Sequence, residues 1–221
     1  MPSTRCTFIG NGRIVAGPGL GFHGLRARGA AAKLRRVPAV DELLRARLGP
    51  IGPWQPSALR LAAVLCPLVE ADGADHLLFV ARPEDQRQHA GQLAFPGGMR
   101  SGDESVLATA LRETEEEIGV PAPAITVLGG LGPRPSSSGI LVHTAVARLQ
   151  PVALRPDPRE VVRVLTMPLA LLRDASRWHE RPPPGGATGA QPRTSPHFEF
   201  GGELLWGLTA RFVRDLVAML A

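Results

Sequence analysis

Apolar stretches separated by a polar turn predict a β-hairpin in the middle of the chain. The segment ALRLAAVLCPLVE (58–70) is mostly apolar, and so is the segment HLLFVARP (76–83). Between them stands ADGAD (71–75), whose Asp and Gly residues suit a tight turn. Two apolar runs joined by such a turn indicate two neighbouring antiparallel strands.

Further segments extend this pattern along the chain. Residues 181–196 (RPPPGGATGAQPRTSP) have the composition of a loop. Gly119 is expected to end the helix that precedes it. Strands and helices mixed in this order predict an α/β fold, a sandwich in which helices cover a mixed sheet. The predicted strands are 124–128, 140–149, 161–166 and 197–200, and the predicted helices are 41–48, 104–118 and 204–220.

Composition divides the chain into three parts. Residues 1–38 are rich in Gly, Ala and Arg and show no sustained period, so they are predicted to form a disordered basic arm. Three interpretations of this arm stay open: an organellar transit peptide, a flexible basic extension, or extra sequence from an upstream start codon. Residues 39–57 are predicted to hold a short helix and a linker, and residues 58–221 to form the folded domain.

The positive charge of the chain is concentrated in the arm. Residues 1–36 contain seven basic residues and no acid, so from a total of +5 the rest of the chain carries −2. Because the folded part is nearly neutral, nucleic acid is not expected as the main partner. We expect a small-molecule substrate, and either a monomer or a homodimer.

The chain shows no features of a membrane protein or of a disulfide scaffold. No apolar run approaches the length that crosses a bilayer. The cysteines Cys6 and Cys66 stand far apart and in no metal or redox spacing. These features suit a cytoplasmic protein, with mitochondrial targeting by the arm as the alternative.

Three carboxylates close together on the helix 104–118 are the main candidates for chemistry. Glu113 and Glu117 are four residues apart and share a helix face, with Glu116 about a third of a turn away. Unpaired, they would repel one another, so a divalent cation gives a reason for the cluster. Hard oxygen ligands suit Mg²⁺ or Mn²⁺.

The rest of this helix supports that interpretation. Val106, Leu107, Ala110, Leu111 and Ile118 form an apolar stripe that would hold the helix against a core. Arg112 can pair with Glu116 at i+4 and keep that carboxylate ionised. A solvated charged face is the alternative, but the Gly turn before the helix and the Gly stop after it favour a built site.

The segment that contains this helix resembles the Nudix box, GX5EX7REUXEEXGU, where U is apolar. Thr114 at the first U position is the one departure, and its methyl group can still pack there. The resemblance implies the Nudix α/β/α sandwich with a loop-helix-loop metal site, and hydrolysis of a nucleoside diphosphate linked to another group. The matching residues are Gly98, Glu104, Arg112, Glu113, Glu116, Glu117, Gly119 and Val120.

The resemblance also implies a role for each box residue. Glu113 and Glu117 resemble the principal metal ligands, and Glu116 a further ligand or a base. Gly98 resembles the residue whose carbonyl joins the metal shell. Glu104 resembles the acid that orients the catalytic loop, and Arg112 resembles the residue that holds the glutamates in place. The mechanism that the resemblance implies is in-line attack of a metal-activated water on phosphorus. Glu160 is a candidate base outside the box.

A second resemblance narrows the substrate. The segment from Arg82 to Gly98 is similar to the signature LLTxRSxxLRxHxGQVAFPGG of Nudix coenzyme A diphosphatases, and the stretch 205–210 resembles a W-G-x-T-A motif of the same subfamily. Coenzyme A carries several phosphates, so a site for it needs fixed positive charge. A structural histidine, surface ion pairs and a core phenylalanine are the alternatives for individual residues. The candidate substrate-binding residues are Arg82, Arg87, His89, Gln92, Phe95 and Gly97.

These features together predict a metal-dependent hydrolase of coenzyme A or acyl-coenzyme A. The expected products are 3′,5′-ADP and 4′-phosphopantetheine or its acyl form. Other Nudix activities, on ADP-ribose, dinucleotides or nucleoside triphosphates, are the first alternative. A catalytically silent Nudix-fold binding domain is the second, against which the complete set of box glutamates argues.

Overall fold

The computed structural model describes residues 6–9, 13–16, 39–81, 92–184 and 194–221. Its main sheet is mixed, because β3 and β8 run parallel while their other neighbours are antiparallel. The strand order is β1-β2-β9-β4-β3-β8-β7, with β5 beside β4 and β6 beside β3. The strands are β1 (Cys6–Ile9), β2 (Arg13–Ala16), β3 (Arg60–Ala71), β4 (Ala74–Ala81), β5 (Leu93–Ala94), β6 (Gly97–Met99), β7 (Ile125–Pro135), β8 (Ile140–Leu149) and β9 (Arg163–Pro168).

Smaller elements complete the fold. A second, three-stranded sheet contains β10 (Trp178–Arg181), β11 (Ser195–Phe200) and β12 (Glu203–Trp206). The helices are α1 (Ala39–Arg47), α2 (Val106–Ile118), α3 (Leu169–Leu172) and α4 (Gly207–Ala218), with 3₁₀ turns η1 (Ala122–Ala124) and η2 (Ala175–Arg177). None of the helices in the described part is long and apolar enough to span a membrane.

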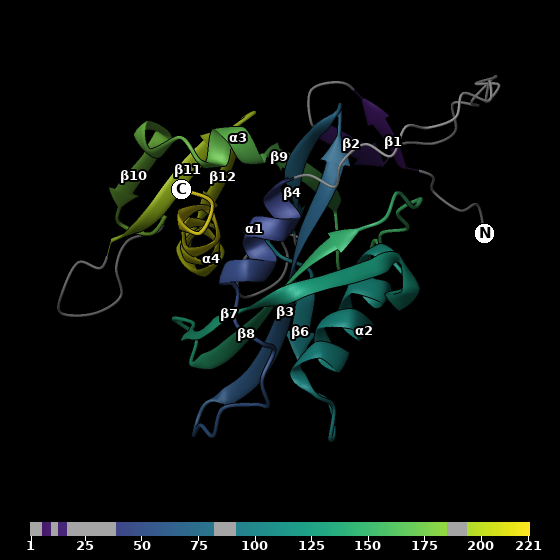
Figure 1. Cartoon of the computed structure of the whole chain (residues 1–221), viewed down its shortest axis with the longest axis vertical. Coiled ribbons are helices and arrows are strands. Elements are labelled where there is room, and N and C mark those ends of the chain that lie inside the picture. Colours follow the sequence, from purple (N-terminus) through teal and green to yellow (C-terminus); the bar gives the residue numbers. More distant parts are fainter. Residues whose placement is uncertain (1–5, 10–12, 17–38, 82–91, 185–193) are drawn as a thin grey trace.

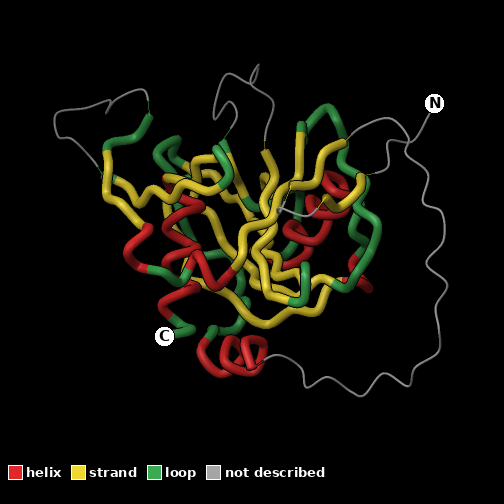
Figure 2. Tube along the Cα trace, turned by 90° about the horizontal axis from the view of Figure 1, so that it is seen from above, coloured by secondary structure: helices red, strands yellow, loops and turns green. Residues whose placement is uncertain are grey.

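Helices cover both faces of the main sheet (Figures 1 and 2). Side chains of β3 alternate between the faces, as a strand buried on both sides requires. Cys66 packs in one apolar cluster with residues of α1 and α4, whereas Leu65 packs in the other with residues of α2. The structure therefore confirms the α/β sandwich that the sequence predicts.

The central hairpin forms where the sequence predicts it. Leu68 pairs with Leu77 and Ala71 with Ala74 in the antiparallel register of β3 and β4. Asp72 and Gly73 have φ angles of 52° and 75°. Two successive positive φ values belong to a tight hairpin turn, and Asp-Gly is well suited to adopt them.

The C-terminal region corrects two predictions. Residues 204–206 belong to β12, so the last helix begins at Gly207 and not at Leu204. Arg181 and Ser195 pair in β10 and β11, so strands enter both ends of the predicted loop 181–196. The missed signal is Gly201-Gly202, whose positive φ values turn β11 into β12 between two apolar runs.

Other element boundaries differ by a few residues. Strand β7 continues to Pro135, well past the predicted end at residue 128, because it follows β8 through two register shifts. Strand β9 begins at Arg163, two residues after its predicted start. Helix α1 spans Ala39–Arg47 in place of the predicted 41–48.

The predicted basic arm contains two short strands. Strands β1 and β2 form an antiparallel hairpin, and Arg13 and Ile14 of β2 pair with Leu165 and Val164 of β9. The expectation of an arm without regular structure is therefore wrong at these two strands. Residues 1–5, 10–12 and 17–38 lie outside the described part.

Candidate active site

Helix α2 is fixed at both ends and along one face. The Ser105 hydroxyl caps its first turn by accepting a hydrogen bond from the Ala108 amide, so the helix begins at Val106 and not at Glu104. Gly119 ends it with φ 71° and donates its amide to the Glu115 carbonyl. Val106, Ala110 and Ile118 are buried beneath it. This packing holds the helix in place, while Glu116 on its acidic face is exposed.

Arg112 organises the acidic face. Its Nη1 donates to Glu113 Oε1 at 2.7 Å and to Glu116 Oε2 at 2.9 Å. Its Nε and Nη2 donate to the two carboxylate oxygens of Glu104 at 2.7 and 3.1 Å. The hydrogen bond from Arg112, assisted by one from the Thr109 hydroxyl, lowers the pKa of Glu104 from 4.5 to about 2. Arg112 therefore contacts three glutamates of the box, and its role in the reaction stays a prediction.

Two glycines of β6 bring the backbone against two of the glutamates. The Gly97 amide donates to Glu117 Oε2 at 3.0 Å, and Glu117 is only 2% exposed. A Cβ on Gly98 would stand 2.3 Å from Glu113 Oε2, so this close approach requires glycine. Gly97 and Gly98 are strand residues paired with β3, which corrects the Gly turn that the sequence predicts before the helix.

The donor set fits a hard divalent cation by its chemistry. One side of α2 carries three carboxylates that could bind such a cation, those of Glu113, Glu116 and Glu117. The Glu113 carboxylate lies against the backbone of Gly98. Among the described residues, no group of three His, Cys, Asp or Glu side chains is close enough together to hold a metal ion. Arg112 bonds Glu113 and Glu116, and the Gly97 amide bonds Glu117. The role of the three carboxylates as metal ligands stays a prediction.

The sequence missed two residues that support the catalytic loop. The Trp54 indole, in the segment between α1 and β3, donates to the carbonyl of Glu104 at 2.6 Å. Thr109 donates its hydroxyl to Glu104 Oε2 at 2.9 Å. Only Thr109 carries a signal in the sequence, since it stands five residues after Glu104, within the helix that the sequence predicts from residue 104. Trp54 is 50 residues away and gives none.

Thr114 occupies the box position where an apolar residue is usual. It is fully buried, and its hydroxyl donates to the Ala110 carbonyl one turn earlier at 2.7 Å. This bond satisfies the polar atom inside the helix, so the methyl group can pack. The departure from the box is accommodated without an unpaired polar group.

Apart from Gly97, whose amide bonds Glu117, the substrate-binding candidates fall into three groups. Arg82, Arg87 and His89 lie outside the described residues. Phe95 is 2% exposed and stacks on Phe79 with ring centroids 5.3 Å apart, so it belongs to the core and not to a substrate site.

Gln92 forms the third group, because it lies against the second subfamily motif. A Cβ built on Gly207 would stand 3.2 Å from Gln92 Nε2. The two segments that resemble coenzyme A diphosphatases therefore meet in space, although more than 100 residues separate them in the sequence.

Glu160 lies in a loop that is attached to the end of α2. The Asp157 amide donates to the Glu117 carbonyl at 3.0 Å, and the Glu160 amide donates to the Asp157 carbonyl. Glu160 is exposed. Its assignment as a base stays a prediction.

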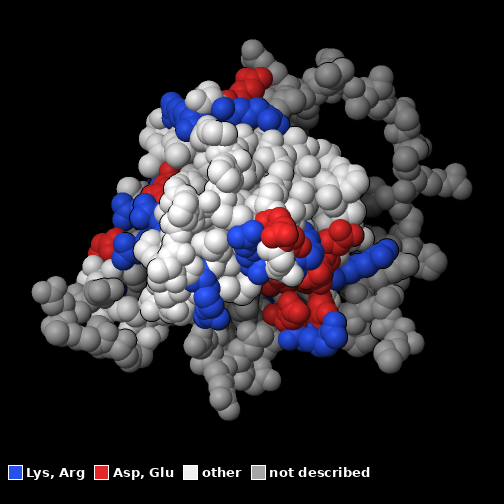
Figure 3. Space-filling view, turned by 90° about the horizontal axis from the view of Figure 1, so that it is seen from below, with Lys and Arg blue, Asp and Glu red and all other residues white. Residues whose placement is uncertain are grey.

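Charge on the face seen from below is mixed. Figure 3 shows acidic and basic side chains alternating in one patch, with mostly uncharged surface around it. Among the described residues on this face there is no broad basic area of the kind that binds nucleic acid.

Comparisons with known proteins agree with this geometry. Residues 59–184 match the NUDIX domain family. An uncharacterized Nudix hydrolase NudL of Photorhabdus laumondii subsp. laumondii is 39% identical over 159 residues, which cover 71% of this chain and 83% of that protein. The NudL of Yersinia pestis (strain Pestoides F) is 38% identical over 160 residues, covering 71% and 78%.

A solved structure supports the fold. The MutT/nudix family protein from Enterococcus faecalis superimposes with a TM-score of 0.50 at 17% identity, over 76% of this chain and 63% of that one. At this identity the likeness concerns the fold alone. From the family match and the relatives, the chain belongs to the Nudix family of hydrolases, which cleave pyrophosphate bonds in nucleoside diphosphate derivatives.

Proposed function

We propose that this hydrolase cleaves the diphosphate bond of coenzyme A or acyl-coenzyme A, giving 3′,5′-ADP and 4′-phosphopantetheine or its acyl form. The observation that carries the proposal is the position of Gln92 beside Gly207. Each residue stands in a segment that resembles the coenzyme A subfamily. Two such segments in contact support one substrate site better than either does alone.

The residues of α2 have distinct roles in this proposal. Glu113, Glu116 and Glu117, with the Gly98 carbonyl, hold Mg²⁺ or Mn²⁺. The cation supplies charge neutralisation on the diphosphate oxygens and lowers the pKa of water. Arg112 holds Glu113 and Glu116 in place through hydrogen bonds, and Glu104 fixes Arg112. Glu116 is exposed, and in the metal-bound protein it would hold the cation in place of its bond with Arg112.

Hydrolysis of another nucleoside diphosphate derivative is the alternative within the same chemistry. The box residues bind the diphosphate and do not distinguish what is attached to it. A cytoplasmic location, a monomeric or dimeric state and the domain boundary at residue 58 remain proposals beside this one.

A substrate panel tests the proposal. Coenzyme A, acetyl-coenzyme A, ADP-ribose, diadenosine tetraphosphate and 8-oxo-dGTP are incubated separately with the full chain and Mg²⁺ or Mn²⁺, and the products are identified by mass. We expect 3′,5′-ADP from the two coenzyme A substrates, at kcat/KM values above those for the others. A higher kcat/KM for any other member of the panel would contradict the proposal.

A further inference from the structure

The segment 49–56, between α1 and β3, joins two distant parts of the fold. At one end it is attached to the β7 edge of the main sheet, because the Gly130 amide donates to the Gly49 carbonyl at 2.8 Å. Near its other end, the Trp54 indole donates to the Glu104 carbonyl at 2.6 Å. The segment therefore ties the loop before α2 to the edge of the sheet.

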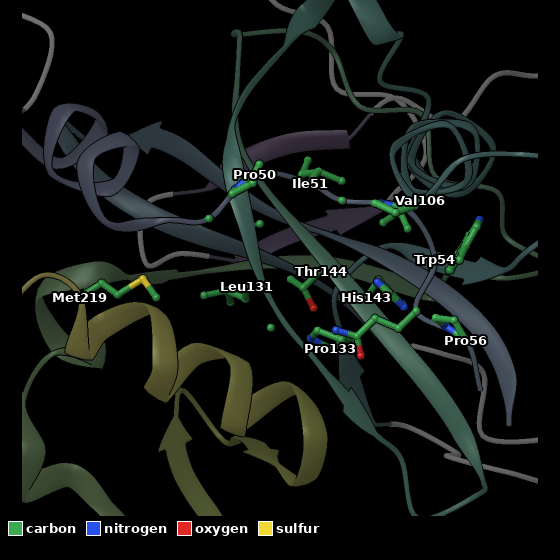
Figure 4. A pocket seen from close by; sticks show the side chains of 16 residues that line it. Pro50, Ile51, Trp54, Pro56, Val106, Leu131, Pro133, His143, Thr144 and Met219 are labelled. Atoms are coloured by element: carbon green, nitrogen blue, oxygen red, sulfur yellow. The ribbon is translucent and has the colours of Figure 1, made fainter. Parts of the chain in front are cut away.

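The ring of Trp54 is held on two sides. It meets the ring of His143 on β8 edge to face, with the centroids 5.0 Å apart. The Arg100 guanidinium lies over the same ring, 5.6 Å from its centroid. Figure 4 shows Trp54 and His143 beside each other at the cavity that the segment 49–56 lines. A ring fixed in this way keeps its N–H directed at one carbonyl.

Glu104 is held at its backbone by Trp54 and at its side chain by Arg112. The Glu104 carboxylate accepts from Arg112 Nε at 2.7 Å and from Arg112 Nη2 at 3.1 Å. Arg112 Nη1 in turn donates to Glu113 and Glu116. Because a carboxylate moves with its own backbone, the position of the Glu104 backbone affects where Arg112 and its two partners on α2 lie.

The indole bond fixes one end of the loop 100–105. The other end is attached to the sheet, since the Arg100 amide donates to the Leu61 carbonyl of β3 at 3.0 Å. Between these points, the Glu104 amide donates to the Ser101 carbonyl at 3.2 Å, which is a bond within the loop itself. The bond from the indole therefore connects the end of the loop that carries Glu104 to a part of the fold outside the loop and α2.

We propose that Trp54 is a positioning residue for the metal site on α2. Its N–H fixes the backbone of Glu104, whose carboxylate holds Arg112. Arg112 then keeps Glu113 and Glu116 where the cation needs them. Groups that orient metal ligands raise metal affinity without touching the ion, and Mg²⁺ tolerates poor ligand geometry badly. This inference rests on the metal site of the proposed function, but not on which nucleotide is hydrolysed.

Binding of Mn²⁺ to the free protein tests the proposal. Mn²⁺ is titrated into the full chain without nucleotide, and the electron paramagnetic resonance signal of the free ion measures what is unbound. Trp54→Phe keeps an aromatic ring beside His143 and removes the N–H. We expect its Kd for Mn²⁺ to rise by about fivefold or more, a smaller loss than for removal of a direct partner of a ligand. An unchanged Kd in the folded variant would overturn the proposal.

A second variant removes the donor with less change of shape. Replacement of Trp54 by 3-benzothienylalanine, at this one position, keeps a bicyclic ring and puts sulfur in place of the N–H. We expect Mn²⁺ binding to weaken by a similar factor. This variant decides the question if Trp54→Phe does not fold, since an affinity equal to that of the wild type would refute the positioning role.

Trp178→Phe is the matched control. The Trp178 indole also donates to a backbone carbonyl, that of Leu172 at 2.8 Å. Its ring also lies under an arginine, Arg214 at 6.0 Å, and against another ring, Phe198 at 5.0 Å. It belongs to the second sheet, so its loss should leave the Kd for Mn²⁺ unchanged. Equal losses of affinity in Trp178→Phe and Trp54→Phe would contradict a specific role for Trp54.

Glu104→Ala tests the route by which Trp54 acts. In this background the carboxylate that links the loop to Arg112 is gone, so Trp54→Phe should cause almost no further loss of Mn²⁺ affinity. A full additional loss in the double variant would mean that Trp54 does not act through Glu104, and would contradict the proposal.

Glu117→Gln distinguishes failure of this inference from failure of the proposed metal site. We expect weaker Mn²⁺ binding to this variant as well, because the site loses one charge. If Glu117→Gln binds Mn²⁺ as tightly as the wild type, the metal site on α2 is wrong. If Glu117→Gln weakens binding and Trp54→Phe does not, the metal site stands and only the positioning role of Trp54 is wrong.

Discussion

Arg112 donates two hydrogen bonds to the carboxylate of Glu104, at 2.7 and 3.1 Å, across eight residues of the chain. The same guanidinium bonds Glu113 and Glu116 through its remaining nitrogen. Glu104 stands just before α2 and the other two carboxylates stand on it. Arg112 therefore fixes the loop and the acidic face of the helix relative to each other.

This contact predicts a pH dependence of stability. The pKa of Glu104 falls from 4.5 to about 2 because of the bond from Arg112. A lowered pKa means that the stabilising contribution is complete above about pH 4.5 and is lost as the pH falls toward 2. We expect the wild type to exceed Glu104→Gln in free energy of unfolding above pH 4.5, and the difference to shrink toward pH 2. Urea denaturation at several pH values checks this, and a difference independent of pH would contradict it.

Gly98→Ala is expected to reduce turnover with little loss of stability. The new Cβ would displace the Glu113 carboxylate, which is the end of a flexible side chain and can move aside. We expect kcat to fall by roughly tenfold or more, because a metal ligand is misplaced, while Tm changes little.

Glu113→Ala provides the control for that variant. In its background, Gly98→Ala has no carboxylate to displace and should cause almost no further loss of kcat. A full additional loss in the double variant would mean that Gly98 acts through something other than Glu113.

Arg148 is expected to stabilise the fold and not the chemistry. It bonds Asp41 of α1 at 2.5 Å and Asp75 of β4 at 2.7 Å, and its side chain is 12% exposed. Arg148→Met leaves two mostly buried carboxylates without their cation, which should cost about 3–5 kcal/mol in the free energy of unfolding.

The matched control is Arg159→Met, because Arg159 pairs with Asp157 while 85% exposed. Its loss should change the free energy of unfolding little, because solvent screens an exposed ion pair. Urea denaturation measures the loss in free energy of unfolding for each variant. Equal losses would show that burial of the ion pairs of Arg148 adds nothing to their contribution to stability.

Deletion of residues 1–38 is expected to leave turnover almost unchanged. The deleted segment contains no residue of the Nudix box, and among its described residues β2 pairs with β9. Strand β9 is separated from β3 and α2 by β4. Steady-state kinetics of the truncated protein check this, and loss of most of the turnover in a folded truncated protein would refute it.

The sequence predicts best what local chemistry determines. The hairpin turn at Asp72-Gly73 and the helix stop at Gly119 follow from the φ angles that these residues adopt easily. The apolar face of α2 follows from its spacing. These features depend on neighbours in the chain, so the pattern is sufficient to locate them.

Features that depend on distant contacts escape the sequence. Leu205 reads as part of an amphipathic helix, but its pairing with Phe198 makes it a strand residue. Trp54 gives no sign that it bonds Glu104, and the β7 bulge opposite His143 exists only through pairing with β8. Tertiary contacts outweigh local propensity at these positions.

The central claim is that the acidic face of α2 binds the cation that hydrolysis requires. Glu117 is buried and accepts from the Gly97 amide, whereas Glu115 is exposed on the same helix. Glu117→Gln keeps an oxygen for that bond but removes one charge from a hard-cation site, so its affinity for the metal should fall.

The most direct test compares the Mg²⁺-dependent hydrolysis of coenzyme A by Glu117→Gln and by Glu115→Gln. The Tm of each variant checks that it is folded. We predict that kcat falls by roughly two orders of magnitude or more for Glu117→Gln, because a strong electrostatic stabiliser is lost. For Glu115→Gln, kcat should stay near the wild-type value. Similar rates for the two folded variants would contradict the assignment of α2 as the catalytic metal-binding element.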